Sequence, residues 1–150
     1  MAAQRYLIPG WFTRNIFNRL VRRLTLLGVS VAGSRELRVR GRQSGQWRVT
    51  PVNPLVVQGE RYLVAPRGTT QWVRNLRAAG GGELRVGRRI EAFQASELAD
   101  AEKAAVLREY LRKWKWEVGQ FFDGLDANAT DRQLADIAPG FPVFRIVPAG

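Results

Sequence analysis

The hydrophobic period of this chain changes at about residue 35, from the 3.6-residue repeat of a helix to the two-residue repeat of strands. Beyond that point, short alternating runs such as ELRVRG and WRVTPVN follow one another, and turns that contain Gly separate them. Alternating runs joined by short turns are typical of antiparallel strands. The middle of the chain is therefore predicted to be an antiparallel meander.

Three helices are expected around these strands. WFTRNIFNRLVRRLTLLG predicts a basic amphipathic helix within residues 1–28. TTQWVRNLRAAG predicts a short helix that Thr69 or Thr70 caps and Gly80 ends, and the glycines 80–82 should then form a flexible joint. A longer helix should run from beyond Ser96 to about Val118, and a loop with a short helical piece should separate it from a last strand in FPVFRIV.

This order of elements predicts an α+β fold of one domain over residues 1–150, with the amphipathic helix in 1–28 and the barrel in 35–147. A helix is followed by four or five short strands with one inserted helix, then by the long helix and the last strand. Short antiparallel strands of this kind close most naturally as a small barrel or a strongly curved sheet.

The amino-acid composition excludes several kinds of catalytic and metal site. Lys and Arg number 24 against 13 Asp and Glu, and 21 of the 24 cations are Arg, whose planar fork suits phosphate and carboxylate groups. The chain has no Cys or His, which excludes disulfides, thiolate nucleophiles, zinc sites built on those residues and Ser-His-Asp triads. No metal site is predicted, and the remaining chemistry belongs to carboxylates, Tyr, Ser or Arg, or to a bound cofactor.

Two basic turns are candidate anion sites. In GRQSGQWRVTPV, the turn from Gly41 to Gln46 is either a hairpin loop that happens to be basic or a backbone cradle for a phosphate held between Arg42 and Arg48. In APRGTTQW, an Arg and a Gly again precede a capped helix, whose first amide groups attract anions. The residues alone leave both interpretations open.

These turns carry a resemblance to a known family. GRQSGQWRVTPVNPLVVQGERYLVAPRGTTQWVRNLRAAGGGELRV resembles the core of the deazaflavin-dependent nitroreductases, which pair a GRKTGxxRxxP segment with A-S-K-G and W-x-x-N-L elements. The resemblance covers residues 35–95 and implies a split β-barrel related to flavin-binding oxidoreductases. It also implies coenzyme F420 as the hydride carrier and a planar electrophile, such as a quinone or a nitroaromatic compound, as the substrate. The coenzyme's phosphate and carboxylate tail would suit the excess of Arg.

The resemblance transfers the family's coenzyme-binding residues to three groups of positions. The first turn would hold the phosphate and tail, and it supplies Arg42, Ser44, Gly45 and Arg48. The next strand would run along the deazaflavin ring, and it supplies Thr50, Pro51 and Val52. The second cradle and the W-x-x-N-L element supply Ala65, Pro66, Arg67, Gly68, Thr69, Trp72 and Asn75. Gln43 stands where relatives often have Lys, and Pro66-Arg67 replaces Ser-Lys, which removes a hydroxyl that relatives place near the substrate.

The long helix carries the candidate substrate residues. A proton for the product would come from water or from Tyr110, the candidate catalytic residue. Aromatic faces suit planar substrates, and a substrate wall is predicted from Tyr110, Trp114, Trp116 and Phe121. Aromatic residues at helical spacing also suit a core, and Trp116 fits the wall best because it falls off the apolar stripe of the helix.

One other function and two other partners stay open at this point. The protein could bind F420 without turning it over. The competing class of protein is a nucleic-acid-binding module. RVRGR and VRRL would then bind phosphates, and bases would stack on Trp47 or Trp72. The arginines are spread over every element, which argues against a single binding groove. Residues 12–27 could dock on an anionic membrane surface. No segment reads as a signal peptide or a spanning helix, so a cytoplasmic protein, peripheral to the membrane at most, is expected as a monomer or homodimer.

Overall fold

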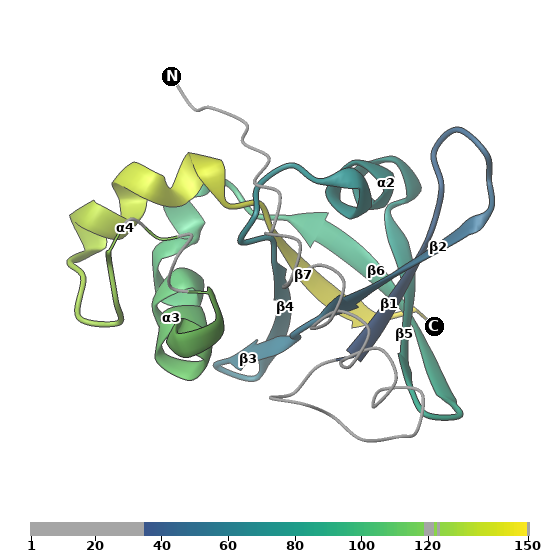
Figure 1. Cartoon of the computed structure of the whole chain (residues 1–150), viewed down its shortest axis with the longest axis horizontal. Helices are drawn as coiled ribbons and strands as arrows, with labels where there is room; N and C mark the ends of the chain where they lie inside the picture. The colour runs from purple at the N-terminus through teal and green to yellow at the C-terminus, as the bar shows by residue number, and fades with distance from the viewer. Residues whose placement is uncertain (1–34, 119–121, 123, 150) are drawn as a thin grey trace.

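The structure, a computed structural model, describes residues 35–118, 122 and 124–149. These residues form a seven-stranded sheet in the order β2-β1-β5-β6-β7-β4-β3, and every neighbouring pair is antiparallel. The strands are β1 (Arg35–Arg40), β2 (Trp47–Val52), β3 (Leu55–Val57), β4 (Glu60–Val64), β5 (Gly81–Val86), β6 (Arg89–Glu97) and β7 (Val143–Pro148). The sheet curls into an open half-barrel (Figure 1), which confirms the predicted α+β split β-barrel.

The prediction of a meander was wrong, although the sheet contains three hairpins of consecutive strands. β1 pairs with β2, β3 with β4 and β5 with β6, so six strands rather than four or five precede the last one. However, β1 lies between β2 and β5, and β7 lies between β6 and β4. Pro54 follows β2 and has no N–H group for a ladder, so the chain leaves the β1 edge there. Pro51 is tolerated inside β2 because β2 is an edge strand.

The glycines 80–82 do not form a flexible joint. Gly80 has the left-handed conformation that ends helix α2 (Gln71–Ala79), and its N–H donates to Leu76 O at 2.8 Å. Gly81 and Gly82 begin β5. A Cβ atom on Gly81 would lie 2.3 Å from Phe93 O, so glycine is needed there because the strands approach closely.

The helices of the described residues lie at two places beside the sheet (Figure 1). Helix α2 follows Thr70 and packs against β1 and β5. Helix α3 (Ala104–Val118) packs against β3 and β4, and α4 (Asp131–Ile137) packs against α3; short 3-10 turns η2 (Asp100–Glu102) and η4 (Ala138–Gly140) complete this end. Helix α3 begins at Ala104, later than predicted, because β6 continues to Glu97 and the separate 3-10 turn η2 then precedes the helix.

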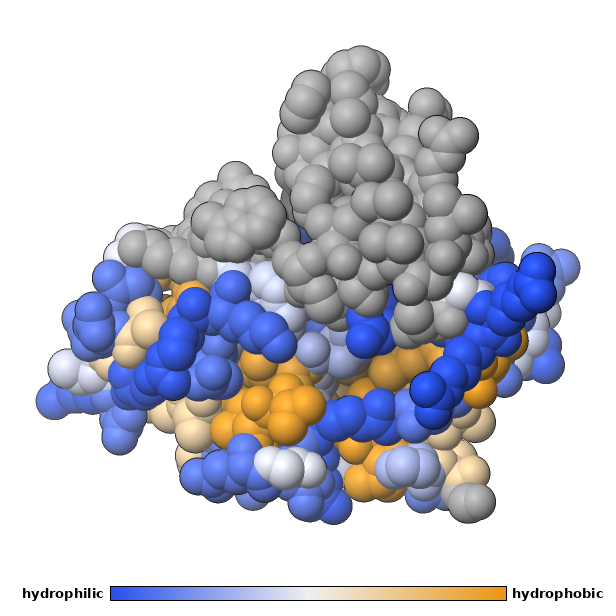
Figure 2. All heavy atoms as spheres, turned by 90° about the horizontal axis from the view of Figure 1, so that it is seen from below, coloured by the Kyte–Doolittle hydropathy of each residue, from blue (hydrophilic) through white to orange (hydrophobic). Residues whose placement is uncertain are grey.

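Two buried clusters correspond to these two places. One lies between α2 and the curved sheet, and it includes Leu37, Val39, Leu63, Val73, Leu76, Phe93 and Phe144. The other lies under α3 and α4, and it includes Leu55, Leu107, Tyr110, Leu111, Trp114, Phe122 and Phe141. On the face shown in Figure 2, hydrophilic side chains flank a smaller hydrophobic area. The predicted helix within residues 1–28 lies outside the described residues.

Candidate functional site

A cavity of about 510 Å³ lies where the turn between β1 and β2 meets the first half of α2. Strand residues form one side of it, the turn forms its rim, and the helix and the residues just before it form the other side. The lining residues are Val39, Gly41, Arg42, Gln43, Ser44, Arg48, Val49, Thr50, Arg67, Thr70, Gln71, Trp72 and Asn75. The two basic turns therefore share one cavity, although they are separated in sequence by most of β2, β3 and β4.

Seven of the predicted coenzyme-binding residues line this cavity, namely Arg42, Ser44, Arg48, Thr50, Arg67, Trp72 and Asn75. The other seven lie beside it in the chain and are not among the lining residues: Gly45, Pro51, Val52, Ala65, Pro66, Gly68 and Thr69. Gly45 (φ 72°) and Gly68 (φ 86°) adopt positive φ, which shapes the two turns. The N–H of Gly68 donates to Ala65 O at 3.2 Å, and that of Thr70 donates to Gly68 O at 2.9 Å.

Six lining residues were not among the predicted site residues: Val39, Gly41, Gln43, Val49, Thr70 and Gln71. A signal for Gln71 was present, because it lies four residues before Asn75 and hence on the same face of a helix. Val39 and Val49 carried no such signal, since an apolar residue in a strand is expected simply to face a core. Only the curl of the sheet brings them to the cavity.

The turn between β1 and β2 is closed by its own backbone. Gly41 N donates to Gln46 O at 2.7 Å, and Gly45 N donates to Gly41 O at 2.9 Å. Ser44 Oγ accepts from Gln46 N at 3.2 Å, and Arg40 Nη1 donates to Gly45 O at 3.0 Å. A Cβ on Gly41 would come within 2.8 Å of Ser44 Oγ, so the turn wraps tightly at this glycine.

Arg42 connects this turn to α2. Its backbone N donates to Asn75 Oδ1 at 3.1 Å, and its Nη1 donates to the same oxygen at 2.8 Å. Nη1 also donates to Gln71 Oε1 at 2.9 Å. Asn75 is buried, with 5% of its surface exposed, whereas Arg42 is exposed. One side of the cavity is therefore held to the other by a short polar network.

The cavity has the electrostatic character of an anion site. Three guanidinium groups line it, on Arg42, Arg48 and Arg67, and none of the described lining residues is acidic. Thr70, also at the lining, has a buried Oγ1 without a hydrogen-bond partner in the described structure. Guanidinium groups bind phosphate and carboxylate oxygens in a planar, bidentate manner. The donor set thus fits a ligand that carries several negative groups.

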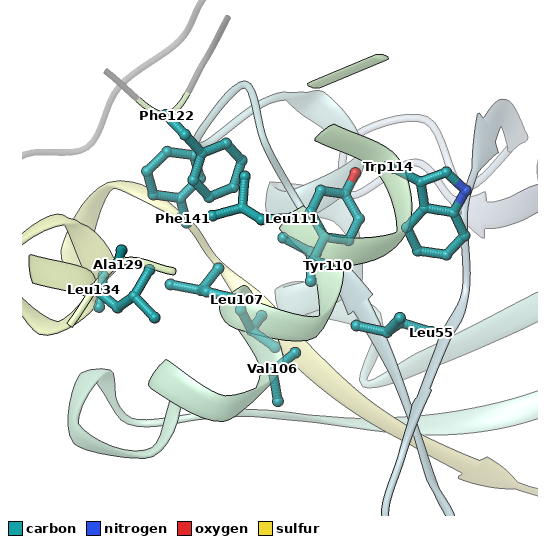
Figure 3. Packing of buried hydrophobic residues seen from close by; sticks show 13 residues of the cluster. Leu55, Val106, Leu107, Tyr110, Leu111, Trp114, Phe122, Ala129, Leu134 and Phe141 are labelled. Atoms are coloured by element: carbon teal, nitrogen blue, oxygen red, sulfur yellow. The ribbon is translucent and has the colours of Figure 1, made fainter. Parts of the chain in front are cut away.

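The predicted substrate residues of α3 lie elsewhere. Tyr110 and Trp114 are buried in the second core cluster, with ring centroids 5.3 Å apart (Figure 3), and neither is among the residues that line the cavity. Trp114 also departs from helical geometry (φ −129°, ψ 23°), which marks a kink in α3. The side chain of Trp116 and all of Phe121 lie outside the described residues. The substrate wall and the catalytic role of Tyr110 stay predictions.

The two tryptophans proposed as stacking platforms have other contacts. The guanidinium carbons of Arg40 and Arg38 lie over the Trp47 ring, at 4.2 and 5.1 Å from its centroid. The Trp72 ring lies against Phe144, with centroids 6.1 Å apart. Within the described part of the chain, no group of three or more Asp or Glu could hold a metal ion, and no helix is long and apolar enough to cross a membrane.

The open antiparallel half-barrel is a fold that solved structures share. A structure described as an F420-H2 dependent reductase is 16% identical, covers 77% of this chain and 94% of its own, and has a TM-score of 0.54. Another, described as a domain-swapped dimer, is 18% identical, covers 91% and 97%, and has a TM-score of 0.55. A protein of unknown function from Agrobacterium tumefaciens is 14% identical, covers 99% and 60%, and has a TM-score of 0.58.

The family comparison is more specific than these likenesses of fold. Residues 14–134 match the F420H2-dependent quinone reductase family, which is most of the chain. The chain belongs to this family and is an F420-dependent reductase whose coenzyme is F420. A search of curated proteins found no match. The F420-dependent reductase family that the resemblance to deazaflavin-dependent nitroreductases implied is thereby confirmed, but the matched family is described by quinone reduction and not by nitroreduction.

Proposed function

We propose that this protein transfers a hydride from reduced coenzyme F420 to a planar electrophile of the quinone type, and that the basic cavity binds the coenzyme. One observation carries the proposal: two turns distant in sequence, each with an Arg, line a single cavity without an acidic residue among its described lining. A ligand with one phosphate and several carboxylates suits such a cavity better than a ligand with a single charge.

The residues of the first turn would hold the phosphate and the tail. Arg42 and Arg48 supply guanidinium donors there, and Ser44 and Gly45 shape the turn. Arg67 would reach the same ligand from the second turn. Gly68 and Thr69, with Ala65 and Pro66, would set the course of the backbone there.

The ring would lie along β2 and the start of α2. Thr50 and Trp72 line the cavity, and Trp72 is half-buried against Phe144, which holds its indole in place. Pro51 and Val52 continue β2 beyond Thr50 and would offer backbone groups along the ring. Val49 adds an apolar side chain to this part of the lining, which would limit the access of water.

The chain's part in the reaction is chiefly to position the reactants. Bound F420 in its reduced form supplies the hydride. The cavity residues bind the anionic groups at a distance from the reacting edge and orient the ring, which lowers the barrier by several kcal/mol when the acceptor is held in register. We propose that water delivers the proton that the product needs, because Tyr110 and Trp114 are buried in the second core cluster and do not line the cavity. Trp116 and Phe121 stay candidates for the acceptor's wall.

A coenzyme titration tests this proposal. The protein should quench the fluorescence of the deazaflavin, and it should leave FMN and NADPH unbound at similar concentrations. Equal affinity for FMN would contradict the assignment of the cavity to F420. A nucleic-acid-binding protein would be favoured instead if the protein bound DNA with strong salt dependence and did not quench the deazaflavin.

The acceptor is tested separately with the reduced coenzyme. A soluble quinone should reoxidise F420H2 in the presence of the protein, and a nitroaromatic compound of similar size provides the comparison. Preferential turnover of the nitroaromatic compound would contradict the quinone assignment while leaving the coenzyme assignment intact.

A further inference from the structure

A single side-chain oxygen joins the two sides of the cavity. Asn75 Oδ1 accepts both the backbone N–H of Arg42, at 3.1 Å, and its Nη1 group, at 2.8 Å. The two residues are 33 positions apart in sequence. Because Asn75 is a buried residue of α2, its oxygen is held by the helix rather than free to follow the turn.

Arg42 is the residue through which the turn contacts α2. The other hydrogen bonds described for residues 41–46 close the turn on itself or reach Arg40 in β1. Those that reach α2 start from Arg42 and end on Asn75 and Gln71. Loss of the Asn75 oxygen would therefore release both the backbone and the guanidinium group of Arg42.

The acceptors around Arg42 are neutral. Both described acceptors of its guanidinium group are side-chain amide oxygens. Several other arginines are paired with carboxylates instead: Arg38 with Glu83 at 3.1 Å, Arg61 with Glu91 at 2.6 Å and Arg77 with Glu97 at 2.7 Å. An amide oxygen orients a guanidinium group through hydrogen bonds, but it leaves the positive charge uncompensated.

We propose that Asn75 is a positioning residue: it holds Arg42 at the cavity while leaving the full charge of Arg42 for an anionic ligand. This inference rests on the proposed function, and it differs from the direct coenzyme contact that the family resemblance implies for Asn75. Asp at this position would keep the shape and the acceptor oxygens but neutralise Arg42. Ala would remove the acceptor altogether.

A double-mutant cycle distinguishes positioning from direct contact. Arg42→Ala, Asn75→Ala and the double variant are titrated with F420, with Arg74→Ala as the control because Arg74 is an exposed arginine of α2 that does not line the cavity. Each single variant should weaken binding by about tenfold or more. The double variant should bind within about twofold of Arg42→Ala, because Asn75 acts through Arg42. Additive losses would overturn the proposal.

Asn75→Asp tests the role of charge. This variant should keep the Arg42 amide protected from hydrogen exchange and keep its melting temperature, yet it should bind F420 about as weakly as Arg42→Ala. Its affinity should also depend less on salt than that of the wild type, because one cation is neutralised. A residue with a purely structural role would not give this result, and wild-type affinity in Asn75→Asp would overturn the proposal.

Hydrogen exchange keeps the inference separate from the coenzyme assignment. If wild-type protein fails to bind F420, the proposed function fails. The contact between Asn75 and Arg42 is then tested by hydrogen exchange alone. Loss of protection at the Arg42 amide in Asn75→Ala, but not in Arg74→Ala, would support it. Unchanged protection in Asn75→Ala would overturn it.

Discussion

At the scale of single residues, the cavity owes its character to a few side chains whose partners differ from those of similar residues elsewhere. Arg42 is oriented by amide oxygens, whereas Arg77 makes a bidentate contact with Glu97. The hydrogen bond to Glu97 raises the pKa of Arg77 above its ordinary value. The charge of Arg77 is thus paired within the protein, whereas the charge of Arg42 can bind an anionic ligand.

Removing a cavity cation should weaken coenzyme binding. Arg48→Ala and Arg67→Ala should each cost about 1.5–3 kcal/mol of binding free energy, since each loses charge-assisted hydrogen bonds. Fluorescence titration with F420 measures the effect. Arg88→Ala is the control, because Arg88 is exposed and does not line the cavity. Unchanged affinity in both cavity variants would mean that these turns are ordinary connections without a role in coenzyme binding.

Two threonines at helix starts should respond in opposite directions to Val. Thr70 Oγ1 is buried without a hydrogen-bond partner in the described structure, so Thr70→Val should raise the free energy of unfolding by about 1 kcal/mol. Thr130 Oγ1 accepts from Gln133 N at 3.1 Å at the start of α4, so Thr130→Val should lower it by about 1 kcal/mol. Urea denaturation without coenzyme measures both. Destabilisation by Thr70→Val would mean that its hydroxyl is paired in solution.

At the scale of elements, β5 lies close to the backbones of both its neighbours, β1 and β6, directly after α2 ends. Gly81 and Gly82 have no side chains to keep neighbouring backbones apart. A Cβ atom on Gly82 would lie 2.6 Å from Arg38 O, on the side of β1. These glycines therefore let β5 fit between its two neighbours directly after α2 ends.

Alanine at Gly81 should destabilise the protein. The new methyl group would collide with Phe93 O, which belongs to the backbone of β6 and cannot rotate away, and the cost should be about 1–3 kcal/mol. Thermal or urea unfolding measures it. Gln94→Ala, at the exposed position that pairs with Gly81, should change stability by less than about 0.5 kcal/mol. Equal stability of both variants would contradict the close approach of β5 and β6.

At the scale of the whole molecule, the cavity and the aromatic cluster occupy different parts of the fold. The cavity lies beside α2 at the turn between β1 and β2, whereas Tyr110 and Trp114 belong to α3 and lie in the second core cluster (Figure 3). A single domain over residues 1–150 stays a proposal. The same holds for a homodimer, although one structural neighbour is described as a domain-swapped dimer.

Docking on an anionic membrane is a prediction for residues 12–27, which lie outside the described residues. Deleting residues 1–28 should abolish flotation with vesicles that contain anionic lipid, because the deletion removes the Arg row of the predicted helix. F420 binding should be retained, and measuring it provides the control for folding. Flotation that persists in the deleted protein would end the membrane hypothesis.

Much of the local structure could be predicted from the sequence. The end of α2 at Gly80 was predicted from the residues around it, and the turn between β1 and β2 likewise depends on residues within a few positions of each other. The start of α3 was misplaced, because residues 98–103 form a connection with the 3-10 turn η2 rather than the first turns of the helix.

The sequence by itself determined the strands, the turns, the excess of Arg, the exclusion of Cys and His chemistry and the family, because each of these depends on local patterns or on composition. The tertiary structure decided the strand order and brought the two basic turns together in one cavity. It set the hydrogen bonds between Arg42 and Asn75. It also decided that Tyr110 and Trp114 are core residues. These outcomes depend on which distant segments pack together, and a periodic pattern specifies a buried face without specifying what covers it.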